Sequence, residues 1–211
     1  MRADAAPQPL SVAPEERLAL AGHDSFCLWF TGLSGAGKST LANLVDRRLH
    51  ERGARSFLLD GDSIRRGLCS DLGFGESDRR ENVRRAAEVA RLFTDAGVVA
   101  IAALISPFRA DREGARRVFA PGRFVEVYVR CPLDVCMTRD PKGLYRRARQ
   151  GLIADFTGVS SPYEEPLSPD VVVDTALMPP DACAGAILAH LERAFRLPAA
   201  PAVRRQAADG R

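Results

Sequence analysis

Residues 26–40 of this chain read FCLWFTGLSGAGKST. Within this stretch, Gly32 to Ser39 form a complete G-x-x-x-x-G-K-S phosphate loop, whose glycines leave backbone N–H groups free to surround the phosphates of a nucleotide. The apolar run before the loop predicts a buried strand, and the apolar spacing over about 38–52 predicts a helix. A strand, a glycine loop and a helix N-terminus in this order predict a nucleotide-binding α/β domain.

Apolar runs and helical patterns alternate along the rest of the chain. Strands are expected at 26–31, 55–59, 98–104, 124–129 and 170–174, and helices at about 38–52, 62–68, 78–96, 111–119, 133–139, 143–150 and 180–196. This alternation predicts a three-layer α/β fold with a parallel five-stranded sheet covered by helices on both faces. Ligands of such sheets bind at the carboxyl ends of the strands, so the polar residues that follow each strand are the candidate site.

The two ends of the chain are rich in Ala and Pro. We therefore expect a mobile segment over 1–16, a single domain over 17–197 and a mobile tail over 198–211. The stretch 139–165 is polar, basic and punctuated by glycines, with aromatic residues embedded in it. It predicts a lid that closes over the nucleotide and excludes water, the alternative being a surface insertion.

The composition excludes several classes of protein. A hydrophobic fraction of 46% over 211 residues is typical of one globular domain, and a net charge of +3 gives no indication of a nucleic-acid partner. The sequence has no secretory h-region and no apolar stretch approaching membrane-span length, so we expect no membrane partner. The five cysteines lack metal or redox spacing, which favours reduced thiols in a cytoplasmic protein.

Lysine is rare, which makes its positions informative. Of 30 Lys and Arg residues, only Lys38 and Lys142 are lysines. Lys38 belongs to the phosphate loop, where it reaches the β- and γ-phosphates. Lys142 lies in the expected lid and is a candidate second phosphate contact, with a solvated loop charge as the alternative.

Two other strand ends carry candidate residues. Asp60 and Asp62 flank a glycine after the second expected strand, where a carboxylate holds Mg²⁺ through water or orients an attacking hydroxyl. The alternative is a turn that leads into a helix N-cap. Ser106 follows the third expected strand, and its sequence context alone favours a turn or cap role.

Several motifs in one order resemble the adenylylsulfate kinase family. They are FTGLSGAGKST (30–40), LLDGDSIRRGLCSDLGFGESDRRENVRRAAEVARLF (58–93), ISPFRADRE (105–113), FVEVYVRCPLDVCMTRDPKGLYRRAR (124–149) and FTGVSSPYEEP (156–166). The first is shared by many small-molecule kinases, whereas the combination is specific to this family, and the resemblance runs from about Arg17 to Phe195.

The resemblance implies an activity and a donor site. The activity is ATP-dependent phosphorylation of the 3′-hydroxyl of adenosine 5′-phosphosulfate, with Mg²⁺ as cofactor, in sulfate activation. Ser39 is implied as a magnesium ligand, with Asp60 acting through water. The residues implied at ATP are Gly32, Leu33, Ser34, Gly35, Ala36, Gly37, Lys38, Ser39, Thr40 and Arg139.

The resemblance also implies an acceptor site and a catalytic set. Phe74 and Phe156 would stack on the adenine of adenylylsulfate from opposite faces. The residues implied around this substrate are Asp62, Arg65, Phe74, Arg79, Asn82, Ile105, Ser106, Lys142 and Phe156. The implied catalytic residues are Lys38, Asp60, Asp62 and Ser106. The family records this serine as a phosphoserine intermediate, but in-line transfer needs only positioning and electrostatics, so we expect no obligatory covalent step.

Some positions depart from the family pattern, and some alternatives remain open. Ser63 stands where Asn is common, and Ser160-Ser161 stand where many members have an acidic residue, but neither change removes a group that the chemistry needs. The alternatives are a nucleoside or sugar-acid kinase, a GTPase-type switch and a non-catalytic nucleotide-binding module. By analogy we also expect a homodimer and a functional link to ATP sulfurylase.

Overall fold

The computed structural model describes residues 11–199. The expected mobile ends lie mostly outside the described residues. The elements are, in chain order, α1 (Pro14–Ala21), β1 (Cys27–Thr31), α2 (Lys38–Glu51), β2 (Ser56–Asp60), α3 (Gly61–Arg66), α4 (Glu76–Asp95), β3 (Val99–Ala103), α5 (Arg109–Arg117), β4 (Phe124–Arg130), α6 (Leu133–Arg139), α7 (Leu144–Arg149), β5 (Val171–Asp174) and α8 (Pro180–Ala194).

The five strands form one parallel sheet with the order β2-β3-β1-β4-β5. The predicted fold class is therefore confirmed. Each strand lies within about a residue of its expected range. For β1, β3 and β4 the reason is that a strand buried on both faces reads as an uninterrupted apolar run. The first strand lies at the centre of the sheet, so the phosphate loop that follows it opens at the middle of the carboxyl edge.

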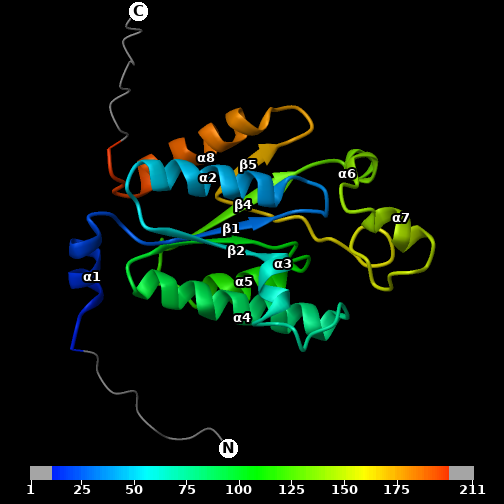
Figure 1. The fold of residues 1–211 in the computed structure, drawn as a ribbon, viewed down its shortest axis with the longest axis horizontal. Helices are drawn as coiled ribbons and strands as arrows, with labels where there is room; N and C mark the ends of the chain where they lie inside the picture. Colours follow the sequence, from blue (N-terminus) through cyan, green and yellow to red (C-terminus); the bar gives the residue numbers. More distant parts are fainter. Residues whose placement is uncertain (1–10, 200–211) are drawn as a thin grey trace, which may run out of the picture.

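Helices cover both faces of the sheet. In Figure 1, α2 and α8 lie on one face, and α4 and α5 lie on the other. Alternate residues of β1 supply the two cores, because successive side chains point to opposite faces. Leu28 and Phe30 belong to the core under α2 and α8, and Cys27 and Trp29 to the core under α4.

The helix α1 was not predicted from the sequence. It begins at Pro14, so the expected domain boundary at residue 17 falls inside a helix. None of its residues is buried, and it therefore lacks the apolar stripe by which a helix is recognised. Its limits are defined instead by the Ala13 backbone N–H, which donates to the Glu16 carboxylate at 2.8 Å, and by a left-handed Gly22 at its end.

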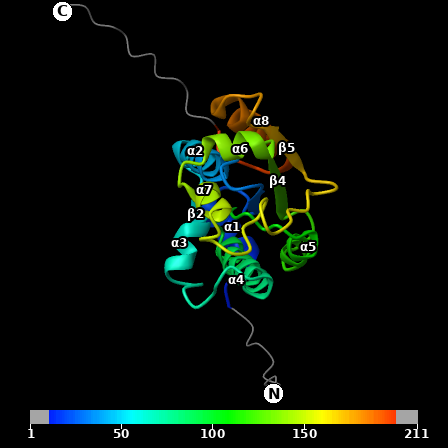
Figure 2. The same ribbon diagram turned by 90° about the vertical axis from the view of Figure 1, so that its right-hand side faces the viewer.

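The expected lid lies at the carboxyl edge of the sheet. Figure 1 shows α6, α7 and the segment after them projecting beyond the strand ends, and Figure 2 views this edge from the front. All five cysteines are free thiols and buried. Among the described residues, no helix combines the length and the apolarity that a membrane crossing requires.

Candidate active site

The phosphate loop has a backbone that only glycine adopts without strain. Gly32 has a φ of +149° and Gly35 a φ of +75°. A Cβ at Gly32 would lie 2.5 Å from the Val129 carbonyl oxygen, and one at Gly35 would lie 2.9 Å from the Cys136 carbonyl oxygen. The loop therefore packs backbone against backbone at Gly32 and Gly35.

Lys38 is buried at the first turn of α2. Its ammonium donates to the carbonyl oxygens of Gly32 at 2.9 Å and Leu33 at 2.7 Å. Burial lowers the pKa of Lys38 to about 8, while the carboxylates of Asp60 and Asp62 oppose that shift. The ammonium is thus held at the loop by neutral acceptors, and phosphate oxygens would stabilise its charge further.

Thr175 connects the far end of the sheet to the phosphate loop. Its hydroxyl donates to the Ala36 carbonyl oxygen at 2.9 Å. The Arg139 guanidinium donates to the Thr175 hydroxyl at 3.1 Å and to the Thr175 carbonyl oxygen at 2.6 Å. Arg139, which the sequence assigned to ATP, therefore lies beside the loop and the turn after β5.

Asp60 caps α3, which is one of the two roles that the sequence left open, and it also contacts Ser39. One carboxylate oxygen accepts from the Asp62 backbone N–H at 3.0 Å and so caps α3. The other accepts from the Ser39 hydroxyl at 2.6 Å. The side chains predicted to face a magnesium ion are therefore in direct contact.

Asp62 and Lys142 face each other across an open cleft. The Asp62 carboxylate forms an ion pair with the Lys142 ammonium, although the two residues are far apart in sequence. The cleft has a volume of about 500 Å³ and is lined by Ser39, Thr40, Asn43, Leu58, Asp60, Asp62 and Lys142. The lid thus contributes a cation to the space between the carboxylates.

Two arginines flank the exposed ring of Phe74. The Arg65 guanidinium lies 4.4 Å from the ring centroid, and that of Arg79 lies 5.8 Å from it. Burial lowers the pKa of both arginines, and Arg65 further lowers that of Arg79. Among residues 11–199 neither guanidinium has a carboxylate partner in an ion pair, so the local charge favours an anion.

Arg79 also connects the Phe74 turn to the lid. It donates to the Phe74 carbonyl oxygen at 2.7 Å and to the Asp155 carbonyl oxygen at 2.7 Å. The next residue, Phe156, is only 7% exposed and packs edge-on against Tyr145 at 5.0 Å, whereas Phe74 is 54% exposed. Arg79 therefore contacts the segments of both rings expected to enclose an adenine, but the Phe74 ring is exposed and the Phe156 ring is buried.

Asn82 lies on the same helix as Arg79, close to one turn further along. Its side chain is buried, and its Oδ1 atom has no hydrogen-bond partner among the described residues. A buried acceptor without a partner is costly in a folded protein. The position is therefore suited to accept a hydrogen bond from a bound molecule.

Ser106 is held in a strained conformation after β3. Its φ is +39°, which costs about 1–3 kcal/mol for a residue other than glycine. The Trp29 indole N–H donates to its hydroxyl at 3.1 Å. The Thr31 hydroxyl donates to the carbonyl oxygen of the neighbouring Ile105 at 2.8 Å. Two residues of the central strand thus fix this loop, and neither contact was predicted from the sequence.

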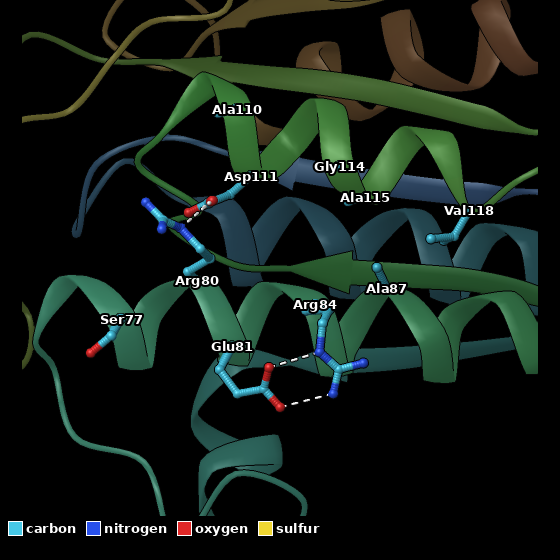
Figure 3. Close-up of a pocket in the computed structure, with 10 residues that line it drawn as sticks. All are labelled: Ser77, Arg80, Glu81, Arg84, Ala87, Ala110, Asp111, Gly114, Ala115 and Val118. Carbon is cyan, nitrogen blue, oxygen red and sulfur yellow. Dashed lines mark hydrogen bonds and ion pairs between the residues drawn. The ribbon is translucent and has the colours of Figure 1, made fainter. Parts of the chain in front are cut away.

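A second depression, of about 410 Å³, lies between α4 and α5 (Figure 3). None of the predicted site residues lines it. In Figure 3, Arg80 points to Asp111, with 3.3 Å between Nε and Oδ1, and Glu81 points to Arg84. The charged groups of this depression are therefore paired with one another.

The comparisons with known proteins show the family of this chain. The model of the adenylylsulphate kinase family matches residues 24–174. A probable adenylyl-sulfate kinase of Halalkalibacterium halodurans is 56% identical over 181 residues, which cover 86% of this chain and 90% of the relative. The adenylyl-sulfate kinase of Burkholderia ambifaria is 60% identical over 166 residues, covering 79% of this chain and 92% of the relative.

A solved structure gives the same result. The APS kinase CysC of Mycobacterium tuberculosis, in complex with AMPPNP and APS, matches with a TM-score of 0.77 and 45% identity, over 80% of this chain and 98% of that chain. The fold and the phosphate loop thus define a nucleotide-binding α/β protein of the phosphate-loop class. Within that class, the chain belongs to the adenylylsulphate kinase family.

Proposed function

We propose that this chain transfers the γ-phosphoryl group of ATP to the 3′-hydroxyl of adenosine 5′-phosphosulfate, giving 3′-phosphoadenosine 5′-phosphosulfate and ADP. The observation that carries the proposal is that the protein has two different anion-binding sites at one edge of the sheet. A backbone cradle with Lys38 suits a triphosphate, and two arginines without carboxylate partners, beside an exposed aromatic ring, suit an anionic adenine nucleotide. Relatives with more than half of their aligned residues identical carry the corresponding name.

The donor nucleotide occupies the cradle from Gly32 to Thr40. The loop N–H groups surround its phosphates, and Lys38 turns from two carbonyl oxygens to the β- and γ-phosphates. Arg139 lies beside the base because Thr175 holds it there. This arrangement lets the residues fix the phosphoryl group before the acceptor arrives.

A magnesium ion fits the residues that line the cleft. A hydroxyl and a carboxylate are oxygen donors of the kind that Mg²⁺ prefers, and Ser39 and Asp60 already bring theirs to 2.6 Å from each other. Among the described residues there is no cluster of three carboxylate, imidazole or thiol groups that could hold a metal. Ser39 and Asp60 would therefore share the ion with the nucleotide phosphates and water, and the ion would neutralise charge on the transferred group.

The acceptor is bound by the residues around Phe74. Arg65 and Arg79 bind the phosphosulfate, and Phe74 offers its exposed ring to the adenine. Asn82 offers its free carbonyl oxygen as an acceptor, and Ile105 and Ser106 line the same pocket. Phe156 contacts the adenine after its lid segment shifts, because its ring is buried in the present arrangement.

Asp62 orients the 3′-hydroxyl for in-line attack and accepts its proton. Lys142 holds this carboxylate from the lid side, so the ion pair between them exchanges for contacts with substrate oxygens as the lid closes. Ser106 lines the pocket without forming a covalent intermediate, since in-line transfer needs only positioning and electrostatics, and the Trp29 indole N–H holds its hydroxyl in place.

Four further expectations come from the sequence. Three rest on the family resemblance, and they are a homodimer, a role in sulfate activation and a functional link to ATP sulfurylase, which makes the acceptor. The fourth, a cytoplasmic location, comes from the cysteine usage. No contact of the described residues carries them, so each is tested in solution.

The test is ATP-dependent turnover with adenylylsulfate, with AMP, shikimate and gluconate as parallel acceptors. We expect conversion of adenylylsulfate alone to its 3′-phospho product, identified by mass and by its phosphorus NMR spectrum, and dependent on Mg²⁺. Turnover only with another acceptor would contradict the roles given to Arg65, Phe74, Arg79 and Phe156 while leaving the donor site intact.

A further inference from the structure

Arg112 is more deeply buried than Lys38 or Arg79, and the function proposed above does not use it. It lies on α5 and is only 3% exposed. Its guanidinium donates to the Ser106 carbonyl oxygen at 2.7 Å, the Glu164 carbonyl oxygen at 2.7 Å and the Glu126 carboxylate at 2.8 Å. One planar group therefore joins the loop after β3, the end of the lid and the strand β4.

The strained Ser106 is fixed from two sides. The Trp29 indole holds its hydroxyl, and Arg112 holds its carbonyl oxygen. Trp29 and Glu126 are register partners on neighbouring strands, so the indole and the carboxylate that pairs with Arg112 lie on the same face of the sheet. A planar fork with fixed donor directions can hold such a geometry, whereas a single ammonium cannot.

The end of the lid is fastened to the same loop. The Glu164 backbone N–H donates to the Pro107 carbonyl oxygen at 2.8 Å, and the Glu164 carboxylate accepts from the Arg109 backbone N–H at 2.8 Å. The Tyr163 hydroxyl lies 3.0 Å from the Thr31 hydroxyl. Arg112 adds to this set of contacts, because its guanidinium lies 5.8 Å from the Tyr163 ring centroid.

The buried charge is balanced on the sheet rather than on the lid. Burial raises the pKa of Glu126, and Arg112 is the main group that lowers it again. The neighbouring Asp111 takes part in another contact, because it points to Arg80 of α4 in Figure 3. Arg112 can thus direct its remaining donors to the two backbone carbonyl oxygens.

We propose that Arg112 is a positioning residue, which sets the Ile105–Ser106 wall of the acceptor pocket and couples it to the Tyr163–Glu164 end of the lid. The role of this wall as part of an acceptor pocket rests on the proposed function. Arg112 touches no substrate. It acts through the backbone of Ser106 and Glu164, so its loss moves the pocket and the lid together.

The test compares Arg112→Lys with Arg116→Lys. Arg116 lies on the same helix and also pairs with Glu126, at 3.8 Å, and with Asp170, at 2.6 Å, but no hydrogen bond joins it to Ser106 or to the lid. For Arg112→Lys we expect the KM for adenylylsulfate to rise about tenfold and the KM for ATP to stay within about twofold. Arg116→Lys is expected to leave both constants within about twofold of the wild type.

A second measurement needs no activity, so it separates this inference from the proposed function. In amide hydrogen exchange, Arg112→Lys is expected to speed exchange about tenfold in residues 105–108 and 156–165 together, while the remaining sheet amides and the Arg116→Lys protein stay as in the wild type. Unchanged exchange in both segments, or an equal rise across the whole domain, would overturn the inference. If Arg112→Lys shows this paired rise but the wild type does not phosphorylate adenylylsulfate, the proposed function fails and the coupling stands.

Because a lysine at position 112 can prevent folding, a second variant removes both buried charges. The double variant Arg112→Gln, Glu126→Gln leaves a neutral pair of similar size. It is expected to show the same paired rise in exchange and the same selective rise in the KM for adenylylsulfate. A double variant with wild-type values for both would contradict the role of Arg112.

Discussion

The phosphate loop and the acceptor pocket lie at the same edge of the sheet but are built differently. The loop is a single run from Gly32 to Ser39, fixed by backbone packing against Val129 and Cys136. The pocket brings together side chains from α3, α4, the loop after β3 and the lid. The phosphate loop is rigid because its close backbone packing excludes other conformations. The acceptor pocket, in contrast, depends on hydrogen bonds between segments that are far apart in the sequence.

The difference has a functional meaning for the two substrates. Many kinases bind the same donor, and a fixed backbone cradle serves all of them. In the function proposed here, selection of the acceptor depends on groups of the lid, such as Lys142 and Phe156, and the contact from Arg79 to Asp155 joins the lid to the Phe74 turn. Changes in the loop should therefore act on ATP and on the fold, and changes in the pocket on adenylylsulfate.

The largest effect is expected for Lys38→Met. Loss of the ammonium removes a fixed charge from the transferred phosphoryl group, so kcat should fall about a thousandfold. Lys142→Met, in the lid, should lower kcat only about tenfold, since its charge is exposed. The measurement is steady-state turnover, with circular dichroism to verify folding, and more than a tenth of the wild-type kcat in Lys38→Met would contradict the donor role.

Arg79→Ala should separate the two substrates. It loses two charge-assisted hydrogen bonds that hold the Phe74 turn and the lid, so we expect the KM for adenylylsulfate to rise about 30- to 100-fold. The KM for ATP should stay within about twofold. Arg84→Ala on the same helix is the control, because within residues 11–199 Arg84 pairs only with Glu81. A wild-type KM for adenylylsulfate in Arg79→Ala would show that the acceptor lies elsewhere.

Gly35→Ala and Gly151→Ala test the rigidity of the loop at the level of stability. The two glycines have nearly equal φ angles, +75° and +72°, so the backbone strain of an alanine is the same. Only the Cβ at Gly35 meets a backbone oxygen, whereas the one at Gly151 has nothing within 4 Å. Gly151→Ala should therefore lower the free energy of unfolding by about 1 kcal/mol, and Gly35→Ala by at least about 1 kcal/mol more, as measured by urea denaturation. Equal losses would refute the close packing.

The smallest expected effect is a pH dependence of nucleotide binding. The pKa of Lys38 is lowered to about 8, so the ammonium loses its proton above that pH, and phosphates bind the charged form. The Kd for AMPPNP should therefore rise about fourfold between pH 7 and 8.5, and the rise should be absent in Lys38→Met. The unfolded chain binds more protons here between pH 8 and 10.5, so the stability cost of the buried charge lessens as the pH rises. A flat titration of Kd in the wild type would contradict the shift.

Sequence alone predicted the parts of this molecule that depend on local pattern. The five strands and the phosphate loop follow from apolar runs and glycine spacing, and Ser39 and Asp60 meet because both follow strands that end at one edge. The helix α1 was missed because it buries no residue.

The contacts between distant segments could not be predicted. Thr175 with Ala36, Thr31 with Tyr163, and Arg112 with Ser106 and Glu164 depend on how whole elements pack. No periodicity in the sequence predicts such pairs. The motifs that contain Arg112 and Tyr163 were recognised in the sequence, but the residues that they contact could not be predicted. Arg65, Phe74, Arg79, Asn82 and Phe156 were assigned to the acceptor only through the family resemblance, since single residues of these types carry no local signal.

The most direct test that the phosphate loop binds ATP and the acceptor pocket binds adenylylsulfate independently is equilibrium binding of each ligand to the same two variants. AMPPNP and adenylylsulfate are titrated separately into the wild type, Lys38→Met and Arg79→Ala by calorimetry. We predict a crossed result, in which Lys38→Met weakens AMPPNP at least about tenfold and leaves adenylylsulfate within about twofold, while Arg79→Ala does the reverse. If each variant weakened both ligands by a similar factor, the loop and the pocket would be a single coupled site and the account would be wrong.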